Sequence, residues 1–135
     1  MSLATLVYAR LSTTAPLTTL VSTRITPEIR ASGSVGFPAV VYGIESVTTS
    51  QAYRQASYFQ AEVEILSLSK TKSQAEQVAG AVFDSLERYV GEDASIRILS
   101  CIHSRSTDGY LSPEAGDNLG VFTASDIFSV LYSKK

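Results

Sequence analysis

The sequence contains one cysteine, one histidine and no tryptophan among 135 residues. A single Cys and a single His cannot form a disulfide framework or a structural zinc site within one chain, because such sites need several ligands. Charged residues make up 18%, with 11 basic against 13 acidic residues and a net charge of -2. This balance lacks the basic patch by which nucleic-acid-binding modules hold phosphate. We therefore expect no metal, no cofactor and no DNA- or RNA-binding function.

Long apolar runs are also absent. No stretch approaches the roughly 20 residues that cross a bilayer, and the N-terminus has no basic n-region or cleavage site. We therefore expect no membrane partner and a soluble protein made in the cytoplasm. The sequence does contain 44% hydrophobic residues, enough for the core of one domain, and we predict a single domain over residues 1–135.

Two segments have helical patterns. Apolar residues recur at helical spacing from Leu3 to Leu11, which predicts a helix capped by Ser2 that runs to about Thr13. Residues 17–21 are expected to add one more helical turn.

A longer helix is predicted after residue 72. Ser73 followed by Glu76 is a capping-box pattern, and an apolar face continues toward Gly91, a natural left-handed stop. Its expected length is about 18 residues, or roughly 27 Å.

Strand patterns occupy the middle of the chain. Residues 39–49 and 53–69 are rich in β-branched and aromatic residues, and within 59–65 apolar residues alternate with Gln60, Glu62 and Glu64. One face of this strand is therefore expected to be buried and the other wet. Because only residues 50–52 separate the two strands, we predict an antiparallel hairpin.

Two loops and two further strands complete the pattern. Residues 24–38 read as a long loop with a short extended piece around Ile25 and Ile29. Residues 96–104 and 121–132 read as strands, joined by a polar loop over residues 105–120 in which Asp108-Gly109 has the composition of a tight turn. The element order predicts an α+β fold, with a mainly antiparallel four- to five-stranded sheet and two helices on one face.

The other face of the sheet is expected to be partly apolar. Leu66 and Leu68 lie in register with Glu62 and Glu64, on the same face of their strand. In the strand over residues 96–104, Leu99 and Cys101 lie on the face opposite to that of Ile98 and Ile102. Either a folded-over loop of the same chain or a neighbouring subunit would cover such a patch, since large exposed apolar patches are unusual on monomers.

Residues with catalytic potential are few. Cys101 and His103 lie on one side of a strand, but catalytic Cys and His normally come from separate elements, and no Asn or Asp is placed to orient the ring. Glu62 and Glu64 share a face, where alternating Glu is typical of a wet strand. The segment at residues 33–36 lacks the Lys of a phosphate loop. We therefore predict no catalytic, cofactor-binding or metal-binding residue.

Other residues suit contacts with protein. Asp126 interrupts an apolar strand and suits an edge-strand gatekeeper or an intersubunit ion pair equally well. Tyr42, Tyr53, Arg54 and Tyr58 cluster on the hairpin, and such residues are enriched in interface cores, although aromatics also simply fill strand faces.

Several motifs resemble one protein family. They are LTTLVSTRI at residues 17–25, FPAVVYGI at 37–44, FQAEVEIL at 59–66, SKTKSQAEQVAGAVFDSLE at 69–87 and FTASDIFSVLY at 122–132. In this order they resemble the tail-completion, or tail-terminator, proteins of long-tailed (siphovirus-type) bacteriophages and prophages. The first loop departs from the family pattern, because residues 26–34 give no firm strand.

The resemblance implies a structural protein without enzymatic activity, located in the tail or neck of the virion and synthesised in the host cytoplasm. Such proteins form a ring, commonly a hexamer, that ends growth of the tail tube and makes the surface for head-tail joining. The implied partners are copies of itself, the major tail-tube protein and the head-tail connector protein, with DNA only passing through the lumen.

By analogy with this family, residues 50–54 and 105–120 reach a neighbouring subunit or the tube. The candidate interface residues are Tyr53, Arg54, Tyr58, Arg105, Asp108, Tyr110 and Asp126. Two alternatives remain open: another neck or minor-tail structural component, and a small enzyme or ligand binder that uses Cys101 and His103.

Overall fold

The computed structural model describes residues 3–22, 24–27, 38–53, 56–93, 95–111 and 120–134, with side chains except at 48–53, 56, 57 and 111. Within these residues the fold is α+β, as expected, but it has three helices and a six-stranded sheet. The elements are α1 (Leu3–Ser12), α2 (Ala15–Val21), β1 (Ile25–Pro27), β2 (Ala39–Tyr53), β3 (Ala56–Ser69), α3 (Lys72–Leu86), β4 (Gly91–Glu92), β5 (Ile96–Leu111) and β6 (Val121–Lys134).

Four long strands form the centre of the sheet. The strand order is β1-β2-β3-β6-β5-β4, and only β1 runs parallel to its neighbour. The expected extended piece at Ile25 is β1, whereas Ile29 and residues 33–36 lie outside the described residues. The strand that sequence patterns miss is β4, which is two residues long.

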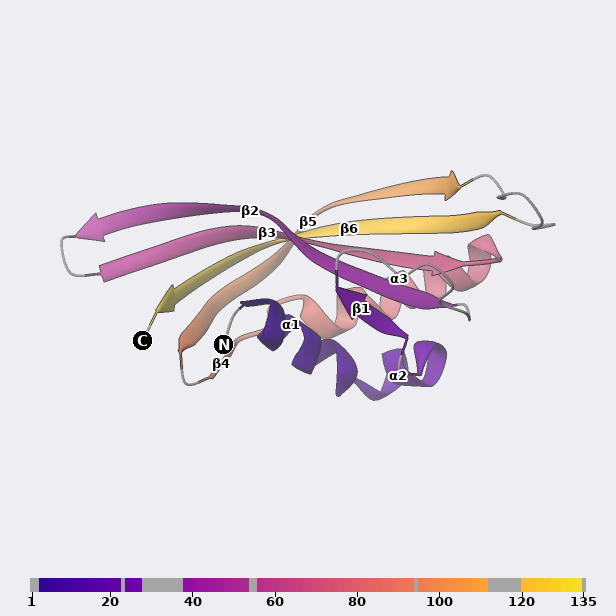
Figure 1. Ribbon diagram of the computed structural model, residues 1–135, viewed down its shortest axis with the longest axis horizontal. Helices are drawn as coiled ribbons and strands as arrows, with labels where there is room; N and C mark the ends of the chain where they lie inside the picture. The colour runs from indigo at the N-terminus through magenta and orange to yellow at the C-terminus, as the bar shows by residue number, and fades with distance from the viewer. Residues whose placement is uncertain are drawn as a thin grey trace.

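The helices all cover one face of the sheet, as predicted (Figure 1). Helix α3 packs on β3 and β6, α1 contacts α3, β1 and β2, and α2 rests on α1 and α3. The predicted stripe of α1 is buried, with Leu11 fully inaccessible, although its expected cap Ser2 lies outside the described residues. The core between the helices and the sheet is therefore built from the apolar stripes of α1 and α3, from Leu17 and Val21 of α2, and from one face of the long strands.

The central hairpin is longer than predicted. The alternation in β3 is confirmed, because Ala61, Val63 and Ile65 are buried and Glu62 is exposed. The predicted turn at residues 50–52 is wrong, since these residues still belong to β2 and Tyr53 pairs with Ala56. They contain no Gly or Pro to end the strand, and the partner strand β3 provides hydrogen bonds along the whole arm.

Both ends of α3 differ from the predicted ones. Thr71, not Ser73, is the N-cap, and its Oγ1 accepts a hydrogen bond from Gln74 N at 3.3 Å. The helix ends at Leu86, and the left-handed residue is Arg88, with φ 61°. Gly91 does not stop the helix because it is already part of β4, so the chain must reverse three residues earlier.

Strand β5 runs through a segment that was predicted to be a loop. Residues 105–111 continue the strand, and Asp108 and Gly109 pair with Ala124 and Thr123 instead of forming a turn. The polar composition hides this strand because its stability comes from the adjacent β6, a dependence on context that is common in sheets. Residues 112–119 lie outside the described residues.

A β-bulge changes which residues of β5 face the core. The register shifts between Ile98 and Ser100, so that Ile98 and Cys101 are both buried while Leu99 and Ile102 are exposed. The predicted opposition of Leu99 and Cys101 to Ile98 and Ile102 is therefore wrong, because a bulge inserts one residue and reverses the alternation.

The sheet face without helices is partly apolar, as predicted. Val41, Leu68 and Ile127 alternate with core residues and so point away from the helices, yet each is less than 9% exposed. Leu99 and Ile102 are 38% and 54% exposed. One part of this face is therefore sealed by the chain itself and another part is open.

Candidate assembly surfaces

The two long outer strands are covered over only part of their length. Strand β1 pairs with β2 from Val40 to Tyr42, and β4 pairs with β5 only at Arg97 and Ile98. Beyond β1, the outer edge of β2 from Gly43 onward has no neighbouring strand in the described part of the chain. Unpaired strand edges of this kind are templates for pairing with another chain.

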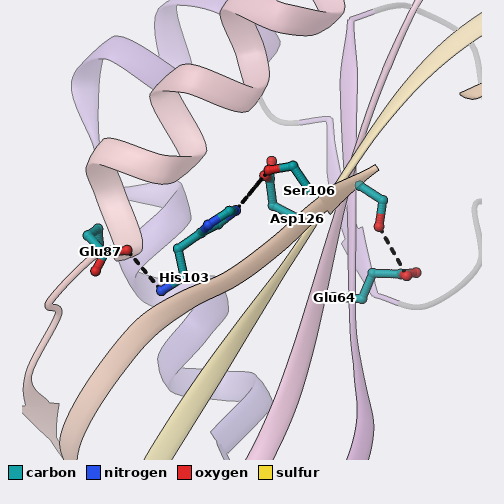
Figure 2. Close-up of polar contacts among 6 residues, drawn as sticks. Glu64, Glu87, His103, Ser106 and Asp126 are labelled. Atoms are coloured by element: carbon teal, nitrogen blue, oxygen red, sulfur yellow. Dashed lines mark hydrogen bonds and ion pairs between the residues drawn. The ribbon is translucent and has the colours of Figure 1, made fainter. Parts of the chain in front are cut away.

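Two contacts from the end of α3 extend the protection of β5. Arg88 N–H donates to Cys101 O at 2.7 Å, and His103 N–H donates to Glu87 Oε2 at 2.9 Å (Figure 2). No further strand among the described residues covers β5 from Ser104 to Leu111. The unprotected segment of β5 thus begins at the bulge after His103.

The uncovered segments lie at opposite ends of the sheet. Strands β2 and β5 run in opposite directions, and each is covered near its own first residues. Figure 1 shows the β2–β3 hairpin projecting at one end and the β5–β6 arm at the other. Among the residues that the structure describes, each subunit therefore has two different free edges that point away from each other.

Two of the predicted interface residues lie near the tip of the β2–β3 hairpin. Tyr53 is the last residue of β2, and Tyr58 is half-buried and pairs with Ser50 and Ser133. Arg54 lies outside the described residues. Their proximity follows from the hairpin, and their role in assembly stays a prediction.

Three other predicted interface residues lie together on the uncovered half of β5. Arg105, Asp108 and Tyr110 are all exposed, and Tyr110 is 53% exposed. Asp108 and Tyr110 are two residues apart, so they point to the same face, which carries the helices.

A shallow cavity of about 300 Å³ lies between this half of β5 and the start of α3. The Tyr110 and Phe122 rings form one wall, with centroids 4.9 Å apart. The other lining residues are Lys72, Ala75, Glu76, Asp108, Gly109, Thr123 and Ala124. We call this cavity the Tyr110 slot. Its aromatic wall and ionisable rim suit an apolar side chain from another protein segment.

Asp126 has an unexpected position. It is 5% exposed and lies on β6, between β3 and β5, so the edge-strand interpretation is wrong. Its Oδ1 lies 2.9 Å from His103 Nε2 and accepts a hydrogen bond from Ser106 Oγ at 2.6 Å (Figure 2). The sequence-based statement that no Asp orients the His103 ring is therefore also wrong. The alternative of an intersubunit ion pair stays a prediction.

The geometry around His103 does not match a catalytic triad. Ser106 Oγ and Asp126 Oδ1 both contact Nε2, whereas a triad holds the acid and the hydroxyl on different ring nitrogens. The ring is also packed edge-on against Phe83 and Phe128. This cluster is therefore suited to joining β5, β6 and α3.

Cys101 is a poor candidate nucleophile. It is 3% exposed, and burial, with a smaller contribution from the charge of Glu87, raises the pKa of its thiol to about 12. The reactive form of cysteine is the thiolate, which is scarce at neutral pH for such a group. The pairing of Cys101 with His103 thus lacks the activation that nucleophilic catalysis needs.

Tyr42 does not belong to the exposed hairpin cluster. It is 8% exposed in the core, and its ring lies 5.9 Å from that of Tyr8. Burial raises the pKa of Tyr42, and Tyr8 adds a smaller effect in the same direction. This tyrosine fills the strand face, which is the simpler of the two interpretations that the sequence left open.

Glu62 and Glu64 lie on the face without helices, as expected. Glu62 is exposed, and Glu64 Oε2 accepts a hydrogen bond from Ser125 Oγ at 3.1 Å (Figure 2).

Among the described residues no group of three or more His, Cys, Asp or Glu side chains is placed to hold a metal ion. In the same part of the chain, no helix is long and apolar enough to cross a membrane.

Some contacts could not be found from sequence patterns. Ser106 and Glu87 both contact His103, although they lie apart from it or from each other in the sequence. The exposure of Val47 on β2, which is 51%, was also not predicted. Neither contact of His103 has a sequence signal, because each depends on the bulge and on the reversal of the chain after α3. The exposure of Val47 depends on how far the helices reach along the sheet.

The fold is similar to that of a chain in a solved structure. It superposes on a chain from the structure entitled "Virion of native gene transfer agent (GTA) particle" with a TM-score of 0.75, 19% sequence identity, and coverage of 96% of this chain and 92% of that one. At this identity the similarity shows a shared α+β fold. No curated protein matches the sequence.

Residues 5–112 match the family Tail completion protein gp17. The match spans most of the chain, so the protein belongs to this family. It is a structural protein of bacteriophage tails, and the family resemblance read from its motifs is confirmed.

Proposed function

We propose that this protein forms a ring at the head-proximal end of the tail tube, ends tube polymerisation and provides the surface for head-tail joining. The proposal rests on family membership together with one structural observation. In the described part of the chain, each subunit has two uncovered strand edges of different sequence at opposite ends of its sheet. A heterologous contact between such edges repeats from copy to copy and forms a ring if the rotation closes.

The partners in this proposal are other copies of the chain, the major tail-tube protein and the head-tail connector protein. A hexamer is the number that the family resemblance implies. The net charge of -2 suits a lumen through which DNA passes without adhering, because cationic side chains would bind phosphate. The proposed role is a mechanical one with no catalysis, and the location is the tail or neck of the virion.

Deletion of the gene in the phage tests this function. We expect particles with overlong tails that lack heads, and rescue by the intact gene. Tail lengths of the deletion mutant are measured by electron microscopy. Tails of normal length would contradict a role in ending tube polymerisation. Tails of normal length that remain unattached would instead indicate another neck component.

A second measurement tests the ring directly. Light scattering of the purified protein, alone and with isolated tail tubes, is expected to show a discrete multiple of the 14.5 kDa subunit. Tubes are included because assembly is often nucleated on a preformed end. A subunit that stays monomeric with tubes present would contradict the proposal.

A further inference from the structure

We infer that the free edge of β2 in one copy pairs, antiparallel, with the free edge of β5 in the next copy, and that Val47 packs at the Tyr110 slot. This inference rests on the proposed function and specifies which surfaces join. It concerns residues 46–53 of β2 and residues 104–111 of β5.

The strand directions permit this pairing. Within one subunit β2 runs opposite to β5, because three antiparallel pairings separate them. When a second copy stands beside the first with its helices on the same side, its β2 therefore meets β5 in the antiparallel sense. Antiparallel pairs are the more stable type and need no crossover connection. The joined sheet would carry helices on one face throughout.

The side chains of the two edges face the same way. Val47 pairs with Ala61 and Tyr110 pairs with Phe122, so both point to the helix-covered face of the sheet. They are nonetheless 51% and 53% exposed, and α3 lies near Tyr110 only across the slot, through Lys72, Ala75 and Glu76. In the joined sheet these two exposed apolar side chains would become cross-strand neighbours, which stabilises a pairing.

The register fixed by Val47 opposite Tyr110 aligns the regular parts of both free segments. It places residue 46 opposite 111 and residue 51 opposite 106, so that the regular pairing begins after the β2 bulge at Glu45 and ends at the second β2 bulge, between Gln51 and Tyr53. Four residues predicted from sequence to be interfacial fall within these segments: Tyr53, Arg105, Asp108 and Tyr110.

Few groups oppose the pairing. Residues 46–53 contain no Lys, Arg, Asp, Glu or Pro, the residue types that usually protect an edge strand from association. In residues 104–111 the charged side chains are Arg105 and Asp108, one of each sign.

Since the free segments lie at opposite ends of the sheet, successive copies would be staggered along the strands, as closed barrels require.

Disulfide trapping tests the pairing. In a Cys101→Ala background, the Val47→Cys, Tyr110→Cys double variant is expected to form a ladder of covalent oligomers on oxidation, because paired antiparallel residues meet the distance required for a disulfide. Each single variant is expected to form no ladder. A Val47→Cys, Phe83→Cys variant is the matched control, since Phe83 is 39% exposed but lies on α3.

Three outcomes would overturn the inference. The double variant gives no ladder, the control gives an equal ladder, or the single variants convert quantitatively to dimers, which would indicate pairing of identical edges. Far-UV circular dichroism of the reduced variants confirms that the subunits are folded.

A charge exchange gives an independent test. Val47→Lys and Tyr110→Glu are each expected to weaken assembly at least tenfold, and the double variant is expected to recover most of that loss. Absence of recovery, with each variant folded, would overturn the inference.

If the wild-type protein forms rings and limits tail length while these variants behave like it, only the pairing is wrong. If the wild-type protein does neither, the proposed function is wrong.

Discussion

His103 Nε2 and Asp126 Oδ1 lie 2.9 Å apart and connect β5 to β6 at a buried position. Asp126→Ala removes the acceptor for both His103 and Ser106. We expect the free energy of unfolding to fall by about 1–3 kcal/mol, because buried polar groups lose their partner. Asp126→Asn retains an acceptor oxygen and should cost less. Equal losses in urea denaturation of the two variants would contradict this role for the Oδ1 contacts.

The N-cap of α3 gives a second prediction. Thr71→Ala removes the side-chain acceptor for Gln74 N–H and is expected to cost about 1 kcal/mol. Ser73→Ala is the control, since Ser73 is exposed within the first turn. Thermal or urea unfolding of both variants measures the difference. A larger loss for Ser73→Ala would favour the capping box predicted from sequence.

Cys101 should make stability depend on alkaline pH. Its pKa is raised from 9.0 to about 12 in the folded protein, so the folded state holds the proton more tightly than the unfolded state. This contribution is complete below about pH 9 and is lost as the pH rises toward 12. The loss is at most about 1.4 kcal/mol per pH unit.

The comparison is with Cys101→Ala, which lacks this group and should show a flatter decline of unfolding free energy between pH 8.5 and about 10.5. The native thiol should also react slowly with iodoacetamide at neutral pH and rapidly in denaturant. Parallel pH profiles for the two proteins, or fast alkylation of the native thiol, would contradict the prediction.

A charge on the buried face of α3 should unfold the domain. Val82 is fully inaccessible, and Val82→Asp is expected to lower the free energy of unfolding by more than about 4 kcal/mol, because the described core cluster that contains Val82 is apolar and offers the carboxylate no partner. Gln77→Asp introduces the same side chain at an exposed position of the helix and should change stability little. Circular dichroism melts of both proteins measure the effect. Similar melting of the two variants would mean that this face is not buried.

Regular alternation made part of the fold predictable. Ala61, Val63 and Ile65 specify one face of β3, and the stripe from Leu3 to Leu11 specifies α1, because burial of these side chains dominates the local free energy. The same patterns gave the antiparallel hairpin and the helices on one face. They are signals that a sequence carries without knowledge of the partner elements.

Other features depend on partners distant in the chain. Asp108 and Gly109 resemble a turn, yet β6 holds them in a strand. The contact between His103 and Asp126 joins residues 23 positions apart, through a register that is set by the bulge after His103. A bulge has no reliable sequence signal, so the predicted grouping of Leu99 with Cys101 on one face of β5 failed.

The carboxylate of Glu87 takes the place of a missing strand at His103 N–H. It therefore marks a boundary within β5 that hydrogen-deuterium exchange can locate in the isolated subunit. Outward-directed amides before this boundary should retain their protons, and those after it should exchange rapidly with solvent. The part of β5 before the boundary can therefore serve as the reference for the part after it. If exchange slows only after the boundary, a neighbouring subunit has bound to the free edge of β5.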